Sequence, residues 1–344
     1  MTGGSQLKTL NFAIVGCGFI ASKHIKAIKN RLDCHLAALY DVNLKAAREL
    51  AHLTGALVYR NYDELIQNDS IHVVIICTPA NLHVPLGIKA AAHGKHLLIE
   101  KPLAVSLEDA DILIEACHRA GVILATVHQH RYKAPVKALK RAITQGELGT
   151  ISHGSAVLRW NRNMDYYTQK PWRGDPLMGG GVLLNQAIHN IDLLQWMLGP
   201  VNRVYGQTAS SILPIKGEET VIAVLQFASG ALGLVEACSS VYPENLEETL
   251  SIFGSKGTVI LSGKSISQVK RWDLASEAAK PEDYAADPAD PGGYIPVFAD
   301  LVQCIRTGHN PLVSAQEGRK TLEIIMAIKD AHLNGKPIEL PLKS

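Results

Sequence analysis

A glycine-containing turn, Gly16-Cys17-Gly18-Phe19-Ile20-Ala21, constrains the start of the chain more than any other feature. It follows the apolar, strand-like run Phe12–Val15 and precedes the helical pattern Lys23–Asn30. The turn fits G-x-G-x-x-A, a permitted form of the dinucleotide-binding fingerprint. In that interpretation Gly16 allows the tight turn, and Gly18 lets the backbone approach a pyrophosphate at the helix N-terminus. The alternative is a purely structural glycine turn.

Strand-like and helical patterns alternate through the first third of the chain. This alternation predicts a parallel sheet with right-handed crossovers, the doubly wound Rossmann arrangement. The segment Val73–Cys77 is almost wholly apolar, as expected of a strand that is covered on both faces. The predicted strands are Phe12–Val15, His35–Tyr40, Leu57–Tyr59, Val73–Cys77, His96–Ile99 and Val122–Val127, and the helices between them are Lys23–Asn30, Leu44–Thr54, Asp63–Gln67, Val84–His93 and Leu107–Ala120.

The second predicted strand ends at Asp41. An acid about 20 residues after the glycine turn can accept a hydrogen bond from the adenine ribose 2′-hydroxyl. No arginine follows Asp41 directly to bind a 2′-phosphate, so NAD is expected rather than NADP. Residues after the later strands are expected to line the same crevice. The expected cofactor-binding residues are Gly16, Gly18, Phe19, Ile20, Asp41, Cys77, Thr78, Pro79, Asn81, His83, Glu100, Lys101 and Gln129.

The pattern changes after about residue 128, where strand-like segments joined by short turns predict a mostly antiparallel sheet. We therefore expect a Rossmann domain at 1–128 and an α/β domain at 129–344, with the last helix able to pack back on the first domain. Ala275–Pro291 is expected to be a surface loop. The strands expected in the second domain are Ile151–Trp160, Arg203–Ser210, Glu219–Phe227, Ala231–Cys238, Leu246–Phe253 and Thr258–Leu261, and its helices are Pro135–Thr144, Val182–Leu198, Ile295–Arg306 and Gln316–Leu333.

A Glu100-Lys101-Pro102 turn follows the predicted strand His96–Ile99. The proline restricts the backbone of the preceding lysine, so the side chain of Lys101 is held close to the strand end. An ammonium group there could position a substrate hydroxyl and stabilise negative charge that develops on its oxygen. The alternative is a surface lysine in a turn.

Three polar residues recur on the otherwise apolar segment Val182–Leu198. Asn185, His189 and Asp192 are spaced i, i+4, i+7, which places them within roughly 60° on a regular α-helix. Such a stripe must face polar partners or a ligand cavity. Histidine is the natural group to exchange a proton near neutral pH, so His189 is a catalytic candidate. The alternative is an internal hydrogen-bond cluster that braces the domain interface, which suits Asp192 equally well.

Further candidates lie near the predicted domain junction and in the loop before Gly179-Gly180-Gly181. Aromatic rings can stack on a sugar or a base, and arginine can pair with a phosphate or carboxylate. The same side chains could instead only pack the loop. The expected substrate-binding residues are Lys101, Arg131, Tyr167, Trp172, Arg173, Asn185 and His189, and the expected catalytic residues are Lys101 and His189.

Composition argues against several classes of protein. The 344 residues carry a net charge of +2, with no basic stripe of interleaved aromatic residues, so nucleic acid is not an expected partner. No apolar run approaches the ~20 residues that span a bilayer, and no signal-peptide core is visible, so a cytoplasmic location is expected. The six cysteines form no C-x-x-C pair. Reduced thiols and no metal site are therefore expected.

The fingerprint, the Glu100-Lys101-Pro102 turn and the helix bearing His189 occur in the order found in the Gfo/Idh/MocA oxidoreductases, which the chain resembles over nearly its whole length. The resemblance implies a Rossmann domain, a C-terminal α/β domain on an open, mostly antiparallel sheet, a cleft between them, and sheet pairing into homodimers or homotetramers. It maps the family's lysine onto Lys101 and its proton-exchanging histidine onto His189. Many members carry aspartate where this chain has Asn185, a departure that weakens an inositol or simple aldose dehydrogenase assignment.

Within the family the chain is most similar to the UDP-N-acetylglucosaminuronate 3-dehydrogenases, a nucleotide-sugar branch that shares asparagine before the histidine. His130 stands where that branch tends to have asparagine, and Met178-Gly179 replaces an acidic residue and glycine, which leaves the sugar open. The matching stretches are Asp165-Tyr166-Tyr167, Pro171-Trp172-Arg173-Gly174, Asn185-Gln186-Ala187, Asp192-Leu193-Leu194-Gln195-Trp196 and Tyr242-Pro243-Glu244-Asn245-Leu246-Glu247.

The resemblance implies hydride transfer between nicotinamide and a ring carbon, expected to be C3, of a sugar or sugar nucleotide. His189 would take the hydroxyl proton while Lys101 orients the hydroxyl. Three alternatives stay open. They are an inositol or aldose dehydrogenase, an NAD-using glycoside-cleaving enzyme, and a non-catalytic nucleotide-binding regulator of the same fold.

Overall fold

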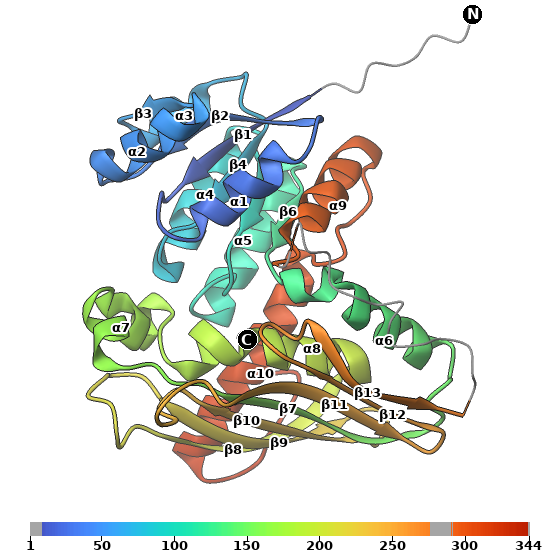
Figure 1. The fold of residues 1–344 in the computed structure, drawn as a ribbon. Helices are drawn as coiled ribbons and strands as arrows, with labels where there is room; N and C mark the ends of the chain where they lie inside the picture. Colours follow the sequence, from blue (N-terminus) through green and yellow to red (C-terminus); the bar gives the residue numbers. More distant parts are fainter. Residues whose placement is uncertain (1–8, 276–289, 291, 343–344) are drawn as a thin grey trace, which may run out of the picture. The chain divides into compact units, whose positions relative to one another are not determined.

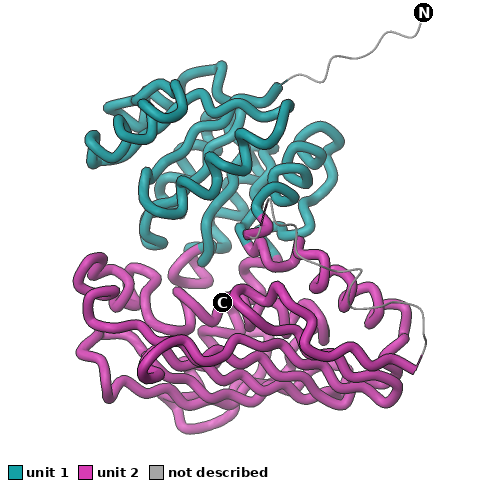
Figure 2. Tube along the Cα trace, in the orientation of Figure 1, with its two compact units in different colours: residues 1–103, 109–127, 294–316 teal, residues 104–108, 128–293, 317–344 magenta. Residues whose placement is uncertain are grey.

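The computed structural model describes residues 9–275, 290 and 292–342, which fall into two compact units (Figure 2). Unit 1 lies within the ranges 1–103, 109–127 and 294–316, and unit 2 within 104–108, 128–293 and 317–344. The chain passes from unit 1 to unit 2 at residue 128, where the sequence pattern changes. Most of the expected loop 275–291 lies outside the described residues.

Unit 1 contains six parallel strands in the order β3-β2-β1-β4-β5-β6 (Figure 1), which confirms the predicted doubly wound sheet. The order reverses between β1 and β4, and in such sheets ligands bind beyond the carboxyl ends of the strands at this point. The strands are β1 Leu10–Val15, β2 Cys34–Tyr40, β3 Leu57–Tyr59, β4 Val73–Ile76, β5 His96–Ile99 and β6 Leu124–Thr126, and the helices are α1 Ala21–Lys29, α2 Leu44–Thr54, α3 Tyr62–Gln67, α4 His83–Ala92 and α5 Leu107–Ala120.

One helix from the C-terminal part of the chain, α9 (Tyr294–Thr307), belongs to unit 1 and not to the second domain as expected. Its Phe298 ring lies 5.4 Å from that of Phe12 on β1, centroid to centroid. The segment after α9 also reaches the sheet edge, because Ser314 bridges Ala125 on β6. The final helix, α10 (Ala315–Asn334), lies almost wholly in unit 2. The apolar pattern of a helix does not say which core it fills, so the sequence could not separate the two.

Unit 2 is built on an eight-stranded sheet in the order β13-β12-β11-β7-β10-β9-β8-β14. All its pairs are antiparallel except β7 with β10, so the mostly antiparallel sheet is confirmed. The strands are β7 Ile151–Arg159, β8 Val201–Ala209, β9 Thr220–Phe227, β10 Leu232–Cys238, β11 Glu247–Gly254, β12 Gly257–Ser262, β13 Gln268–Leu274 and β14 Ile338–Glu339, of which β13 and β14 were not expected. The other elements are η2 Gln129–Tyr132, α6 Ala134–Thr144, α7 Met164–Thr168, η3 Pro171–Gly174, η4 Pro176–Met178, η5 Leu183–Ala187 and α8 Ile188–Leu198.

The two faces of this sheet differ. One face packs against helices: a side chain at Gly154 on β7 would meet Leu194 and Leu198 of α8, and one at Gly206 on β8 would meet Ile328 of α10. The other face carries exposed apolar side chains on three adjacent strands. These are Tyr205 on β8, Ile222 and Val224 on β9, and Leu232 and Leu234 on β10. We call this set the open-face patch.

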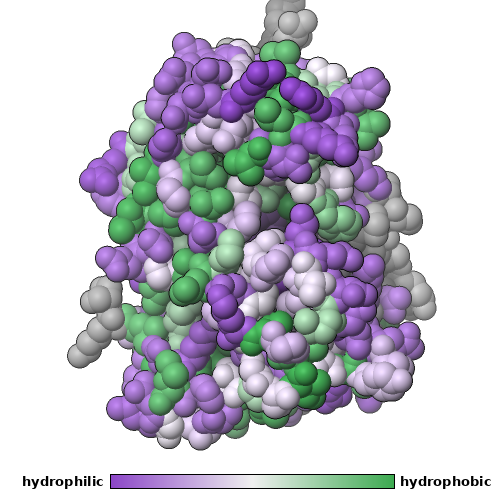
Figure 3. All heavy atoms as spheres, turned by 90° about the vertical axis from the view of Figure 1, so that its left-hand side faces the viewer, coloured by the Kyte–Doolittle hydropathy of each residue, from purple (hydrophilic) through white to green (hydrophobic). Residues whose placement is uncertain are grey.

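The surface is otherwise mixed. On the face shown in Figure 3, hydrophobic residues form small groups between hydrophilic ones. None of the helices that the structure describes is long and apolar enough to cross a membrane.

Candidate active site

The glycine turn lies against the end of β4. Gly16 has φ +96°, and a Cβ there would stand 2.8 Å from the backbone of Cys77, so only glycine fits. A Cβ at the exposed Gly18 would meet nothing within 4 Å. The turn is therefore closed toward the sheet and open at Gly18, where a pyrophosphate could approach the backbone. The buried hydroxyl of Thr78 has no hydrogen-bond partner among the described residues, which also suits a ligand at this edge.

Asp41 connects the turn to the end of β2. Its carboxylate accepts hydrogen bonds from the backbone N–H of Cys17 and of Asn43, each at 2.7 Å. A carboxylate has about four acceptor positions, so capacity remains for ribose hydroxyls. Phe19 is 77% exposed beside this turn. These residues fit the adenosine end of NAD.

The ring nitrogens of His83 are engaged within unit 1 and not available to a cofactor as expected. The side chain is buried, and both ring nitrogens lie within hydrogen-bond distance of carbonyl oxygens, Nδ1 at 2.8 Å from Pro102 and Nε2 at 2.9 Å from Thr78. Burial lowers the pKa of His83, an effect that these carbonyl contacts oppose. The imidazole thus ties the loop after β4 to the Glu100-Lys101-Pro102 turn. A direct cofactor contact by this side chain is replaced by a structural role.

Glu100 is also directed inward. One carboxylate oxygen lies 2.8 Å from Nε2 of His24 on α1, and the other accepts the backbone N–H of Lys101 at 3.3 Å. His24 is fully buried and was missed at sequence level, although a histidine among the buried positions of α1 was a usable signal. Burial lowers the pKa of Lys101, and the adjacent Glu100 opposes that shift. An ammonium group that gives up its proton more readily than usual suits a site that handles a substrate proton.

The remaining expected cofactor contacts divide between the units. Cys77, Thr78 and Pro79 follow β4 and are half-buried, and Asn81 is exposed. Gln129 is buried in unit 2.

The helical segment that carries His189 is not regular. Residues 183–187 form a π-helical turn, η5, before α8. The wider turn changes the angle between Asn185 and His189, so the 60° arc expected from α-helical spacing does not apply. The His189 ring is half-buried and lies 4.6 Å from the His130 ring at 31°, and 5.6 Å from the His128 ring at 82°. Single π turns inside α-helices often occur at functional sites.

Arg131 is not available to a substrate, contrary to expectation. Its side chain is fully buried, and three of its nitrogens donate to the carboxylates of Asp192 and Glu317. Thr321 adds a hydrogen bond to Asp192 at 3.0 Å. Burial alone would raise the pKa of Asp192, but the Arg131 guanidinium brings it below its ordinary value. The internal cluster considered as the alternative for Asp192 is what the structure contains.

The loop before the glycines converges on Tyr166. The Tyr166 hydroxyl accepts from the side-chain amides of Asn185 at 3.2 Å and Gln186 at 3.3 Å. The Arg173 guanidinium stacks over the Tyr166 ring at 4.0 Å and donates to its carbonyl oxygen at 2.9 Å. Tyr166 therefore connects this loop to the start of the His189 helix.

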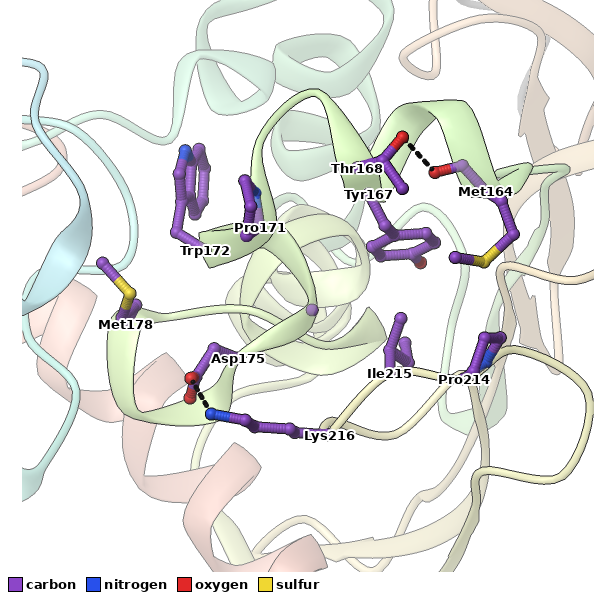
Figure 4. A pocket seen from close by; sticks show the side chains of 11 residues that line it. Met164, Tyr167, Thr168, Pro171, Trp172, Asp175, Met178, Pro214, Ile215 and Lys216 are labelled. Atoms are coloured by element: carbon purple, nitrogen blue, oxygen red, sulfur yellow. Dashed lines mark hydrogen bonds and ion pairs between the residues drawn. The ribbon is translucent and has the colours of Figure 1, made fainter.

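A pocket of about 320 Å³ opens in unit 2 beside this loop (Figure 4). Trp172 and Tyr167 contribute aromatic rings to it, and Asp175 and Lys216, paired at 2.8 Å, lie at one side. The Tyr167 hydroxyl is engaged with Ser239 at 3.1 Å, so Tyr167 offers the pocket its ring. The other lining residues are Met164, Thr168, Pro171, Gly174, Met178, Pro214 and Ile215. Pro214–Lys216 were not expected, because they follow Tyr167 by more than 40 residues.

The thiols and possible metal ligands give no second centre. Burial raises the pKa of Cys17 to about 12, and Cys77 is shifted in the same direction, so neither thiol is reactive. Within the described ranges, no group of three or more histidine, cysteine or acidic side chains is placed to hold a metal ion.

Comparison with known proteins identifies the family of the chain. Residues 10–128 match the Gfo/Idh/MocA oxidoreductase family, NAD-binding Rossmann fold, and residues 136–260 match the C-terminal domain of the same family. Two solved structures are WlbA dehydrogenases in complex with NADH and UDP-GlcNAcA. The one from Bordetella pertussis is 32% identical with a TM-score of 0.91, covering 98% of this chain and 99% of that chain. The one from Chromobacterium violaceum is 31% identical with a TM-score of 0.92, covering 98% and 97%.

A curated relative with a different named substrate is the myo-inositol 2-dehydrogenase of Thermotoga maritima. It is 27% identical over 342 residues, which is 96% of this chain and 98% of that protein. The family matches together span well over half of the chain. The chain therefore belongs to the Gfo/Idh/MocA family and is an NAD-binding oxidoreductase.

Proposed function

We propose that this oxidoreductase oxidises a ring hydroxyl, at C3, of a nucleotide sugar that resembles UDP-N-acetylglucosaminuronate. The observation that carries the proposal is the full-length similarity to the two WlbA dehydrogenases, at 31–32% identity. Asn185, four residues before His189, supports the same choice, because the inositol and simple aldose enzymes of the family tend not to have asparagine there.

NAD, when bound, supplies the hydride acceptor. The chain's own residues then hold the cofactor and handle the substrate proton. Gly16 and Gly18 leave room for the pyrophosphate, and Asp41 accepts from the ribose. The turn at Lys101 places an ammonium group after β5, where it orients the substrate hydroxyl and stabilises charge on its oxygen. His189 takes the proton of that hydroxyl as general base.

The substrate loop carries the part of the substrate beyond the reacting ring. The pocket between Trp172 and Ile215 is mainly apolar and has an aromatic wall, which suits a flat heterocyclic base better than a second sugar ring. Tyr166 connects this pocket to Asn185, because consecutive residues Tyr166 and Tyr167 contact the two sites. Arg173, held over Tyr166, supplies a cation close to both.

We also propose that two copies of the chain pair through the open-face patch. Cross-strand neighbours align the patch across three strands, since Tyr205 pairs with Val224 and Val224 pairs with Leu234. Contiguous exposed apolar area on a sheet face is typical of a protein interface. A second copy offers the same face, and a two-fold axis would make it self-complementary.

The experiment is a substrate panel. Purified protein with NAD would be mixed with UDP-N-acetylglucosaminuronate, other UDP-sugars, free aldoses and inositols, and NADH formation would be followed by its absorbance. We expect turnover with the uronate nucleotide, and loss of turnover without loss of NAD binding in Lys101→Ala and His189→Ala. Turnover confined to inositols would instead favour the polyol dehydrogenase alternative, which the Thermotoga relative supports. Release of a sugar from glycosides would favour the glycoside-cleaving alternative.

A further inference from the structure

A buried imidazole stands behind the lysine turn. His24 Nε2 lies 2.8 Å from Glu100 Oε1, and the two side chains are 0% and 8% exposed. Both belong to unit 1, His24 on α1 directly after the glycine turn and Glu100 directly after β5. The contact therefore joins the helix that starts the cofactor site to the turn that carries Lys101.

The geometry fixes which nitrogen carries the proton. Nδ1 of His24 has no hydrogen-bond partner among the described residues, whereas Nε2 faces a carboxylate oxygen. A neutral imidazole with that environment keeps its hydrogen on Nε2 and donates it to Glu100. The ring is also held from behind, because Tyr294 packs on it edge-on at 5.1 Å and Phe298 at 5.8 Å.

Glu100 acts on the charge of the lysine that follows it. Its second oxygen accepts the backbone N–H of Lys101, and its field favours the charged ammonium against the effect of burial. The charge of Glu100 also acts on the thiol of Cys77 and on the imidazole of His83. The Cys77 thiol stays protonated because burial raises its pKa, and both His83 nitrogens face backbone carbonyls. His24 therefore gives Glu100 a buried side-chain donor.

We propose that His24 is a positioning residue for Lys101, acting through Glu100. By donating to the carboxylate, the imidazole fixes Glu100 in place, and Glu100 in turn favours the charged form of Lys101. The role of Lys101 in turnover rests on the proposed function. The coupling between the three side chains does not, and it can be measured without a substrate.

The experiment measures the ionisation of the Lys101 amine directly. The protein with NAD bound would be labelled with acetic anhydride across a pH series, and the modification of Lys101 quantified by mass spectrometry, since only the deprotonated amine reacts. In His24→Phe the aromatic packing remains but the donor is lost, so the Glu100 carboxylate is no longer held beside the lysine turn and its attraction for the ammonium weakens. We expect the labelling midpoint of Lys101 to fall by about one pH unit.

A double-mutant cycle separates coupling from a general loosening of the turn. Glu100→Gln removes the charge that acts on Lys101 and should lower the labelling midpoint at least as far as His24→Phe does. The His24→Phe/Glu100→Gln double variant should have the midpoint of Glu100→Gln alone. His24→Gln keeps a donor near the Nε2 position and should restore the wild-type midpoint. Additive shifts in the double variant, or a wild-type midpoint in His24→Phe, would overturn the proposal.

Two controls complete the test. His93→Phe changes an exposed histidine at the end of α4, outside the turn, and should leave the midpoint unchanged. Thermal melting of each variant reports whether it folds, and His24→Leu, which also removes the donor, replaces the phenylalanine variant if that one does not fold. Normal turnover in Lys101→Ala would refute the proposed function while leaving the labelling result intact, so the two failures can be told apart.

Discussion

The Arg131 guanidinium donates to both carboxylate oxygens of Asp192, from Nε at 2.8 Å and from Nη2 at 2.7 Å. Both side chains are fully buried. Asp192 lies one turn after His189 on α8, and Arg131 follows His130 in η2. The pair therefore joins the two segments whose imidazole rings lie 4.6 Å apart. The ion pair is thus the internal support of the proposed general base.

Breaking this pair from one side should be costly. Arg131→Met leaves the Asp192 carboxylate buried without its cation, and such changes typically destabilise a protein by about 3–5 kcal/mol. We expect a loss of that size in the free energy of unfolding, measured by urea denaturation. Arg203→Met, at the exposed pair with Glu339, is the matched control and should change it by less than about 1 kcal/mol. Equal effects of the two variants would contradict the buried role.

Glu248 gives a pH-dependent prediction. Burial raises the pKa of this carboxyl to about 7, although Ser265 donates to it and Lys133 attracts its charged form. In the unfolded chain the carboxyl would titrate at its ordinary, lower value, so between the two values the folded state binds more protons. Its contribution to stability is therefore present at low pH and is lost as the pH rises toward 7.

The variant Glu248→Gln should remove that contribution. We expect the free energy of unfolding, measured by urea denaturation from pH 4.5 to 7.5, to fall with pH less steeply in the variant than in the wild type, by on the order of 1–3 kcal/mol over the range. Glu244→Gln, an exposed acid in the loop before β11, is the control and should follow the wild-type curve. A variant curve parallel to the wild type would show that Glu248 is ionised throughout.

The parts of the fold that followed from local pattern were predictable. The strands of unit 1, the glycine turn and the lysine turn depend on short-range periodicity and on residues with special backbone properties. The unit to which α9 belongs was not predictable, because its apolar stripe would fit the core of either unit.

In the candidate site, too, local pattern predicted some features and not others. Asn185 and His189 could be singled out as polar residues on an apolar helix, but the π turn between them leaves no trace in residue spacing. Arg131 donates to Glu317, which is remote in the sequence. His83 contacts the backbone oxygen of Pro102, which no side-chain pattern reveals. Whether a polar side chain faces a ligand or an internal partner depends on such contacts, and no local pattern contains them.

Asp41 should decide the cofactor preference. Asp41→Asn keeps an oxygen for one of the two backbone N–H donors but removes the charge that disfavours a 2′-phosphate. We expect NAD affinity to fall about tenfold and the preference for NAD over NADP to narrow, since a hydrogen bond to a charged group contributes about 1.5–3 kcal/mol. Cofactor titration by protein fluorescence would measure both. Asp63→Asn, at an exposed pair with Lys89, should change neither, and an unaltered NAD affinity in Asp41→Asn would rule out the ribose contact.

The open-face patch should govern assembly. Val224→Glu places a carboxylate at the centre of the patch, where pairing of two copies would bury it without a partner. We expect the wild type to sediment as a dimer or tetramer and the variant as a smaller species. Leu333→Glu, an exposed leucine at the end of α10, is the matched control and should not change the sedimentation coefficient. A wild-type coefficient for Val224→Glu would exclude this face as the interface.

Trp172 should affect substrate binding rather than the chemical step. Its ring lines the pocket assigned to the base of the nucleotide, and stacking on an aromatic side chain contributes roughly 1–3 kcal/mol per base. Because the base is bound equally in the ground state and the transition state, Trp172→Ala should raise KM for a nucleotide sugar about tenfold or more and leave kcat nearly unchanged. Trp172→Phe should have a KM between those of the wild type and Trp172→Ala. Leu177→Ala changes an exposed residue of the same loop outside the pocket and should have the wild-type KM.

A fall in kcat at constant KM would place Trp172 at the reacting carbon instead. An unchanged KM would mean that the Trp172 ring does not hold the base.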